Sequence, residues 1–274
     1  MADQIFSLQQ FITGLGLAAV IGLAGWAVGS LSISGAAAAL IVGTLIFGFG
    51  GLLWAALLIT FFISSSLLSK MFSSKKASLS EKFEKGSRRD WAQVFANGGA
   101  GAFLAIIALL FPQEAWPWLA FAGSMATVNA DTWATELGVL SPKLPRLITT
   151  WKPVPTGTSG GITLAGTSAT FLGGAVIGMV GWLFQPSFPA GAFLAAVSLA
   201  GLTGSLVDSL LGATLQAIYY DPARQKETER RIMNEDGRPA APVRGRQWMN
   251  NDMVNFISSV CGALAAAGLW QLFT

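Results

Sequence analysis

Carboxylate and amide side chains stand inside segments that are otherwise strongly apolar. The stretch NADTWATELG, residues 129–138, ends a long hydrophobic run and contains Asn129, Asp131 and Glu136, and Asp208 stands alone in GLTGSLVDSLLGATLQ, residues 201–216. Two further apolar segments add Asn97, Asp252 and Asn255. A carboxylate in a membrane-spanning helix costs roughly 2.5–3.5 kcal/mol on insertion scales and normally faces a cavity or a partner. These residues are therefore candidates for metal or phosphate chemistry.

The sequence restricts that chemistry to oxygen ligands and cations. It contains no histidine and a single cysteine, Cys261, which excludes imidazole bases and cysteine-rich metal sites. Mg²⁺ suits such a set, because it takes one or two carboxylates together with phosphate oxygens. We predict that Asp131, Glu136, Asp208 and Asp252 are Mg²⁺ ligands. The alternative is that basic loop residues neutralise these acids and that the pairs are only structural.

The elements that must position these side chains are membrane-spanning helices. Of the 274 residues, 53% are apolar and 11% are charged, far from the quarter of charged residues usual in a soluble domain. Apolar stretches long enough to cross a bilayer number seven. The sequence predicts an all-α, polytopic transmembrane bundle of about seven helices, with residues 1–274 forming a single integral membrane domain.

Positive charge is confined to three segments between the hydrophobic stretches. All 17 Lys and Arg residues lie in 70–89, 143–152 and 224–246. The positive-inside rule therefore predicts cytoplasmic loops at 70–90, 141–161 and 217–250. With seven crossings, the N-terminus is expected in the cytoplasm, the C-terminus on the opposite side, and the uncharged loop 30–34 away from the basic loops.

The basic loops also supply candidate phosphate ligands. The segment 141–161 brings Lys152 and a Gly/Ser/Thr turn to the start of a helix, where backbone N–H groups bind anions. We predict phosphate binding by Lys152 and by this turn, through Thr158, Ser159, Gly160 and Gly161. Further predicted phosphate or substrate contacts are Arg88, Arg89, Arg146, Arg244, Asn97, Asn129 and Asn255. The alternatives are a simple loop-to-helix cap for the turn and membrane anchoring for the Arg and Trp residues.

Acids in one half of the bundle, basic loops above them and a tall apolar bundle below suggest a ligand with a phosphate end and a hydrocarbon end. Phosphoryl transfer needs mainly positioning and charge neutralisation, which a histidine-free site can supply. The residues alone therefore indicate an enzyme or a carrier for a lipid phosphate.

Four strings in a fixed order carry a family resemblance: GSRRDWAQVFANGG, NADTWATELG, PRLITTWKPVPTGTSGG and GSLVDSLLGATLQ. From about Lys82 to the C-terminus the chain resembles the integral-membrane family called domain of unknown function 92, whose plant member is phytyl-phosphate kinase of vitamin E (tocopherol) synthesis. The resemblance implies transfer of a phosphoryl group from CTP or another nucleoside triphosphate to phytyl or geranylgeranyl monophosphate. It does not fix residue roles, so those given above come from the residues.

The remaining expectations follow from this function. The partners would be a prenyl monophosphate, a nucleoside triphosphate and membrane lipids, with no nucleic acid and with a homodimer left open. The active site would face the cytoplasm of a bacterial or cyanobacterial-type inner or thylakoid membrane. The rival functions are a transporter or scramblase of isoprenoid phosphates and a lipid-phosphate cytidylyltransferase.

Overall fold

The computed structural model describes residues 7–72, 86, 88–222, 225–231 and 240–274, and parts of the predicted loops 70–90 and 217–250 fall outside these ranges. Seven α-helices occur in the described residues, as the sequence predicted. They are α1 (Leu8–Ala27), α2 (Ile33–Met71), α4 (Trp91–Ala108), α5 (Trp116–Gly138), α6 (Leu164–Phe184), α7 (Ala190–Thr214) and α8 (Asn251–Phe273). Six of them are long and apolar enough to cross a membrane, and α5 falls short because of its polar residues.

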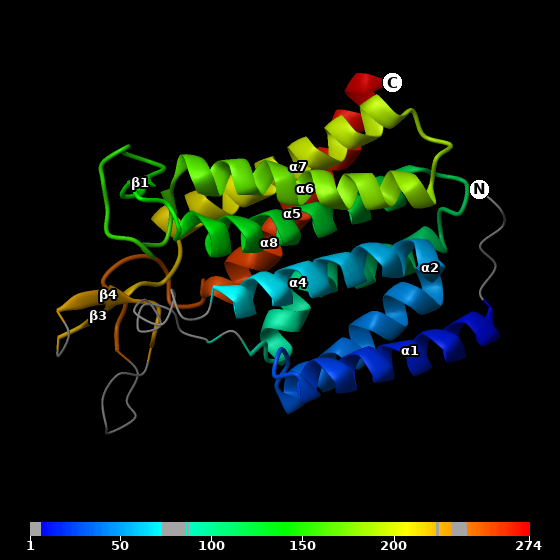
Figure 1. Ribbon diagram of the computed structural model, residues 1–274, viewed down its shortest axis with the longest axis horizontal. Coiled ribbons are helices and arrows are strands. Elements are labelled where there is room, and N and C mark those ends of the chain that lie inside the picture. Colours follow the sequence, from blue (N-terminus) through cyan, green and yellow to red (C-terminus); the bar gives the residue numbers. More distant parts are fainter. Residues whose placement is uncertain (1–6, 73–85, 87, 223–224, 232–239) are drawn as a thin grey trace.

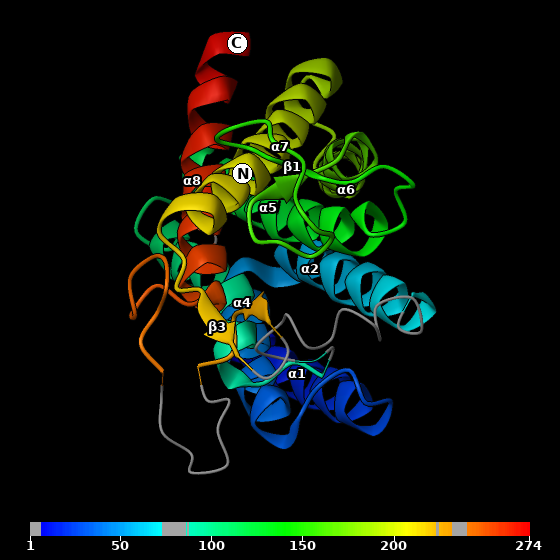
Figure 2. The ribbon, with the colours of Figure 1, turned by 90° about the vertical axis from the view of Figure 1, so that its left-hand side faces the viewer.

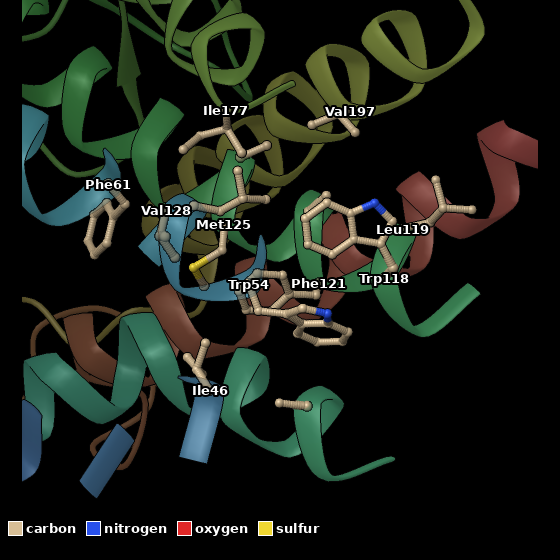
Figure 3. Packing of buried hydrophobic residues seen from close by; sticks show 14 of the residues in the cluster. Ile46, Trp54, Phe61, Trp118, Leu119, Phe121, Met125, Val128, Ile177 and Val197 are labelled. Carbon is tan, nitrogen blue, oxygen red and sulfur yellow. The ribbon is translucent and has the colours of Figure 1, made fainter. Parts of the chain in front are cut away.

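Helix α5 lies at the centre of the bundle and packs against α2, α4, α6, α7 and α8. Its residues from Pro117 to Ala130 are buried without interruption, so the helix is shielded by protein rather than by lipid. In the apolar core, Trp54 of α2 meets Phe121 and Met125 of α5 (Figure 3), and the rings of Trp54 and Phe121 are 4.4 Å apart. A helix surrounded by other helices can carry polar residues that a lipid-facing helix cannot.

Helix α2 reverses its direction at Gly51. This residue has φ 74° and ψ −165°, a conformation outside the helical region that glycine adopts without a Cβ penalty. Figure 1 shows the first half of α2 running away from the end of α1 and the second half returning. Both ends of α2 consequently contact Arg89: Ser32 N–H donates to its carbonyl at 2.9 Å, and its Nη1 donates to Ser66 Oγ at 3.0 Å.

The reversal corrects the predicted topology. The chain crosses the bundle once more than the number of helices suggests, so the start of α1 and the end of α8 lie at the same end (Figure 1). The expectation of termini on opposite sides is therefore not met. Residues 30–34 lie with the basic segments rather than opposite them, since Arg89 N–H donates to Ser30 O at 3.0 Å.

The loops at the other end of the bundle contain two short antiparallel pairs, visible on the left in Figure 1 and facing the viewer in Figure 2. In the first, β1 (Arg146–Leu147) pairs with β2 (Gly161–Ile162), with Arg146 opposite Ile162. In the second, β3 (Tyr219–Asp221) pairs with β4 (Lys226–Thr228).

Every helix that starts at this loop-bearing end has a polar N-cap. Ser32, Asp90, Thr163 and Asn250 accept backbone hydrogen bonds at the starts of α2, α4, α6 and α8. Such caps satisfy N–H groups that have no partner within the helix. They fix the positions of four helix N-termini around the same region.

Candidate functional site

A cavity of about 540 Å³ lies at the loop-bearing end, between α4, α5, α6, α7 and the segment 156–163. Of the predicted site residues, ten line it: Arg89, Asn97, Asp131, Glu136, Thr158, Ser159, Gly160, Gly161, Asp208 and Asn255. They come from segments far apart in the sequence. The structure thus brings the central helix, the Gly-rich turn and the acid of α7 to one opening.

Asp131 of α5 and Asp208 of α7 form the first acidic position of the cavity. Ser205 Oγ donates to Asp131 Oδ1 at 3.4 Å, and Ser258 Oγ donates to Asp208 Oδ2 at 3.3 Å. The two carboxylates are close enough to interact electrostatically. Two like charges held this close repel each other, and a cation between them or beside them would stabilise both.

Glu136 and Arg89 form the second position, five residues further along α5. Glu136 is 4% exposed, and its Oε1 accepts a hydrogen bond from Ser69 Oγ at 2.7 Å. Arg89, 9% exposed, interacts electrostatically with Glu136, and its guanidinium carbon lies 5.4 Å from the ring centre of Phe61. Burial lowers the pKa of Arg89 to about 10, and the Glu136 charge partly opposes that shift. Arg89 remains a cation at neutral pH.

These two positions modify the predicted metal site. Among the described residues, no three His, Cys, Asp or Glu side chains converge closely enough to hold one metal ion. Asp131 and Glu136 have separate neighbours, because a regular helix separates residues five apart around its axis. The carboxylates of Asp131 and Asp208 would therefore be available to one metal ion, whereas Glu136 interacts with Arg89 instead.

The Gly-rich turn packs directly on α7. Gly160 has φ +83°, and a Cβ built there would lie 2.5 Å from the Cβ of Ala213. Thr163 then caps α6 by accepting from Gly166 N–H at 2.9 Å, and both residues line the cavity. The cavity therefore has a helix N-terminus in its wall, a feature that favours anions.

The segment after β4 contributes two residues to the lining of the cavity that the sequence did not predict as site residues. Glu229 and Arg230 line it, and Glu229 Oε1 accepts hydrogen bonds from Ser159 Oγ and from Gln216 Nε2, each at 2.9 Å. The charged composition of 224–246 gave no indication of which residues face inward. Ser205 and Ser209 also line the cavity, and their spacing around Asp208 was a usable signal.

Six predicted residues are not among those that line the cavity. They are Arg88, Asn129, Arg146, Lys152, Arg244 and Asp252.

The contacts of three of the six explain their positions. Arg88 Nε donates to Leu31 O at 2.9 Å, and Arg146 Nη1 donates to Trp151 O at 2.8 Å. Asn129 is fully buried and joins α2 to α6, accepting from Ser64 Oγ and donating to Gly173 O, both at 2.8 Å. These groups are used for backbone and interhelical hydrogen bonds.

The other three also lie outside the lining of the cavity. Lys152 is exposed on the loop between β1 and β2. Arg244 Nη1 donates to Gly212 O at 3.1 Å, which attaches the loop before α8 to the end of α7. Asp252 is buried in the first turn of α8.

The described lining contains four carboxylates, from Asp131, Glu136, Asp208 and Glu229, and two guanidinium groups, from Arg89 and Arg230. The cavity is therefore lined by more acidic than basic side chains, whereas the basic loops had predicted a lining rich in cations. A polyanionic ligand would need additional positive charge there, which a divalent cation supplies.

The fold and this cavity define a polytopic integral membrane protein with a polar site at one end of its bundle. Comparison with known protein families agrees with this description. The family model described as "Integral membrane protein DUF92" matches residues 16–263, so the chain belongs to this family. No solved structure matches the chain.

Relatives of the chain include plant, cyanobacterial and archaeal proteins. The chain is 36% identical to Protein PGR of Arabidopsis thaliana over 251 residues, 84% of this chain and 85% of that protein. It is 29% identical to Protein VTE6, chloroplastic, of the same plant, over 88% of this chain and 66% of that protein. An uncharacterized membrane protein of Methanocaldococcus jannaschii is 35% identical over 64% of this chain and 71% of its own length.

Proposed function

We propose that this protein is a prenyl monophosphate kinase, which transfers the terminal phosphoryl group of CTP or another nucleoside triphosphate to phytyl or geranylgeranyl monophosphate. The observation that carries the proposal is the acid-rich cavity with a helix N-terminus and a Gly-rich turn in its wall. The similarity to VTE6 and the family resemblance noted above support the choice of a prenyl phosphate.

The donor set fits Mg²⁺. Asp131 and Asp208 would hold it through their carboxylates, and phosphate oxygens and water would complete its coordination. When bound, Mg²⁺ would supply positive charge that neutralises the negative charge of the phosphate oxygens during the transfer.

The residues of the chain then orient two phosphates. Backbone groups of 158–161 and the start of α6 would bind the nucleotide, while Arg89 and Asn97 would bind the acceptor monophosphate. An oxygen of that monophosphate forms a bond to the γ-phosphorus as the bond to the bridging oxygen of the nucleoside diphosphate breaks. Because the acceptor is already an anion, the transfer needs no general base.

We propose further that the loop-bearing end is cytoplasmic, because it contains every Lys and Arg of the described residues. The shared end of the two termini would then lie on the opposite side of the membrane. A nucleoside triphosphate donor is available on the cytoplasmic side.

Product analysis tests this function against its two rivals. Purified protein in nanodiscs receives phytyl monophosphate, Mg²⁺ and CTP labelled in either the α- or the γ-phosphate. A kinase moves only the γ-label to the lipid, and a cytidylyltransferase moves only the α-label. Absence of both transfers, with binding of phytyl monophosphate retained, would contradict the kinase and favour a carrier.

A further inference from the structure

A second, apolar cavity adjoins the polar one. It has a volume of about 80 Å³ and lies between α1, α4 and both halves of α2. Apart from Arg89 and Asn97 its lining is formed by apolar residues and glycine, including Ala39, Val42 and Ile59 of α2. The reversal at Gly51 creates this space, because it places the two halves of α2 beside each other and beside α4.

Arg89 and Asn97 line both cavities. The guanidinium carbon of Arg89 lies 5.4 and 6.0 Å from the ring centres of Phe61 and Phe62, which belong to the apolar cavity. The same guanidinium interacts with Glu136, which lines the polar cavity. A cation and an amide therefore stand at the boundary between a polar space and an apolar one.

We infer that the apolar cavity holds the part of the acceptor's hydrocarbon chain next to its phosphate, with Arg89 and Asn97 contacting the phosphate itself. The inference rests on the proposed function and names the route of the lipid. The two lining residues shared by the cavities and the positive charge of Arg89 fit a molecule that is anionic at one end and apolar beyond it. The small volume holds only the first part of the chain, and the remainder extends into the bilayer.

The contribution of this cavity is positional. The bilayer is already apolar, so moving the chain from lipid into protein gains little from the hydrophobic effect. What the cavity provides is a fixed place for the phosphate relative to the donor. A displacement of about 1 Å in reacting groups can lower a rate by about 10²-fold.

The variant Ala39→Phe fills the cavity, and Ala37→Phe is its matched control. Ala37 belongs to the same half of α2, is exposed and does not line the cavity. We expect Ala39→Phe to lower kcat/KM for phytyl monophosphate by about 10- to 100-fold with an unchanged KM for the nucleotide. Ala37→Phe should leave both constants unchanged. Equal effects of the two variants would overturn the inference.

Photolabelling of the unmodified protein does not depend on any variant folding. The probe is a prenyl monophosphate with a diazirine on its first isoprene unit, in nanodiscs. Peptide mapping should find the label at 39–43, 58–62 or 94–98, and excess phytyl monophosphate should suppress it, whereas phytol and phosphatidylcholine should not. Label found elsewhere, with kinase turnover present, would exclude the apolar cavity as the position of the hydrocarbon chain without contradicting the kinase function. Suppressible label at these segments without turnover supports the route and contradicts the kinase.

Discussion

The substitution Gly160→Ala tests whether the Gly-rich turn must lie against α7 for the site to work. An alanine at φ +83° adopts the left-handed region at a cost of about 1–2 kcal/mol. Its Cβ would also lie 2.5 Å from the Cβ and 2.7 Å from the Cα of Ala213, while non-bonded carbons prefer about 3.5–4.0 Å. The turn must therefore move by about 1 Å away from α7.

That movement also strains the hydrogen bond from Ile148 N–H to Gly160 O, 3.0 Å long, which contributes about 1 kcal/mol when intact. We expect a local destabilisation of about 2–3 kcal/mol and, because a 1 Å displacement of binding groups is involved, a fall of about 10²-fold in kcat/KM for the nucleotide. The assay is steady-state kinetics with varied CTP, together with thermal unfolding in nanodiscs.

Gly29→Ala is the control for backbone strain. Gly29 has φ +75°, a Cβ there would meet no atom within 4 Å, and the residue does not line the cavity. This variant should lose only the stability that an alanine with positive φ costs, and it should retain activity. Normal nucleotide kinetics for Gly160→Ala, or an equal loss in Gly29→Ala, would show that the site does not depend on the contact of the turn with α7.

Three other substitutions address single contacts. Asp208→Asn should preserve the fold measured by circular dichroism and lower kcat by at least about 10²-fold, because it removes a carboxylate that interacts electrostatically with Asp131; near-normal turnover would exclude a ligand role. Arg89→Lys should raise KM for the acceptor by about tenfold without changing KM for CTP, since lysine lacks the planar guanidinium; a selective effect on CTP would reassign the residue. Ser159→Ala removes a 2.9 Å hydrogen bond to Glu229 worth about 1 kcal/mol, so KM for CTP should rise about fivefold, and unchanged kinetics would show that this contact has no role.

The sequence predicted the acidic part of the site because its signal is local. Polar residues in an apolar helix must face protein or water, and this principle selected Asp131, Glu136 and Asp208, which line the cavity, but also Asp252, which does not. The Gly-rich turn before α6 was predicted for a similar reason, since Thr158 to Gly161 precede a helix N-terminus.

The sequence could not predict the reversal of α2, because FGFGGLLW is apolar on both sides of Gly51 and contains no proline or charge to mark an end. One residue with positive φ determines whether the termini share an end. Nor could it predict which loop cations face inward. Arg88 and Arg89 are neighbours in sequence, yet the first bonds to Leu31 O and the second lines both cavities, a difference set by the tertiary path of the loop.

The proposed kinase depends on Asp131 and Asp208 binding a divalent cation together with phosphate. Electron paramagnetic resonance of Mn²⁺ in place of Mg²⁺, with a non-hydrolysable CTP analogue, tests it most directly. We expect bound Mn²⁺ with phosphorus hyperfine coupling, lost in Asp131→Asn and Asp208→Asn and kept in Glu114→Gln, since Glu114 is an exposed acid between α4 and α5. Undiminished Mn²⁺ binding in both aspartate variants would exclude these two carboxylates as ligands of the cation.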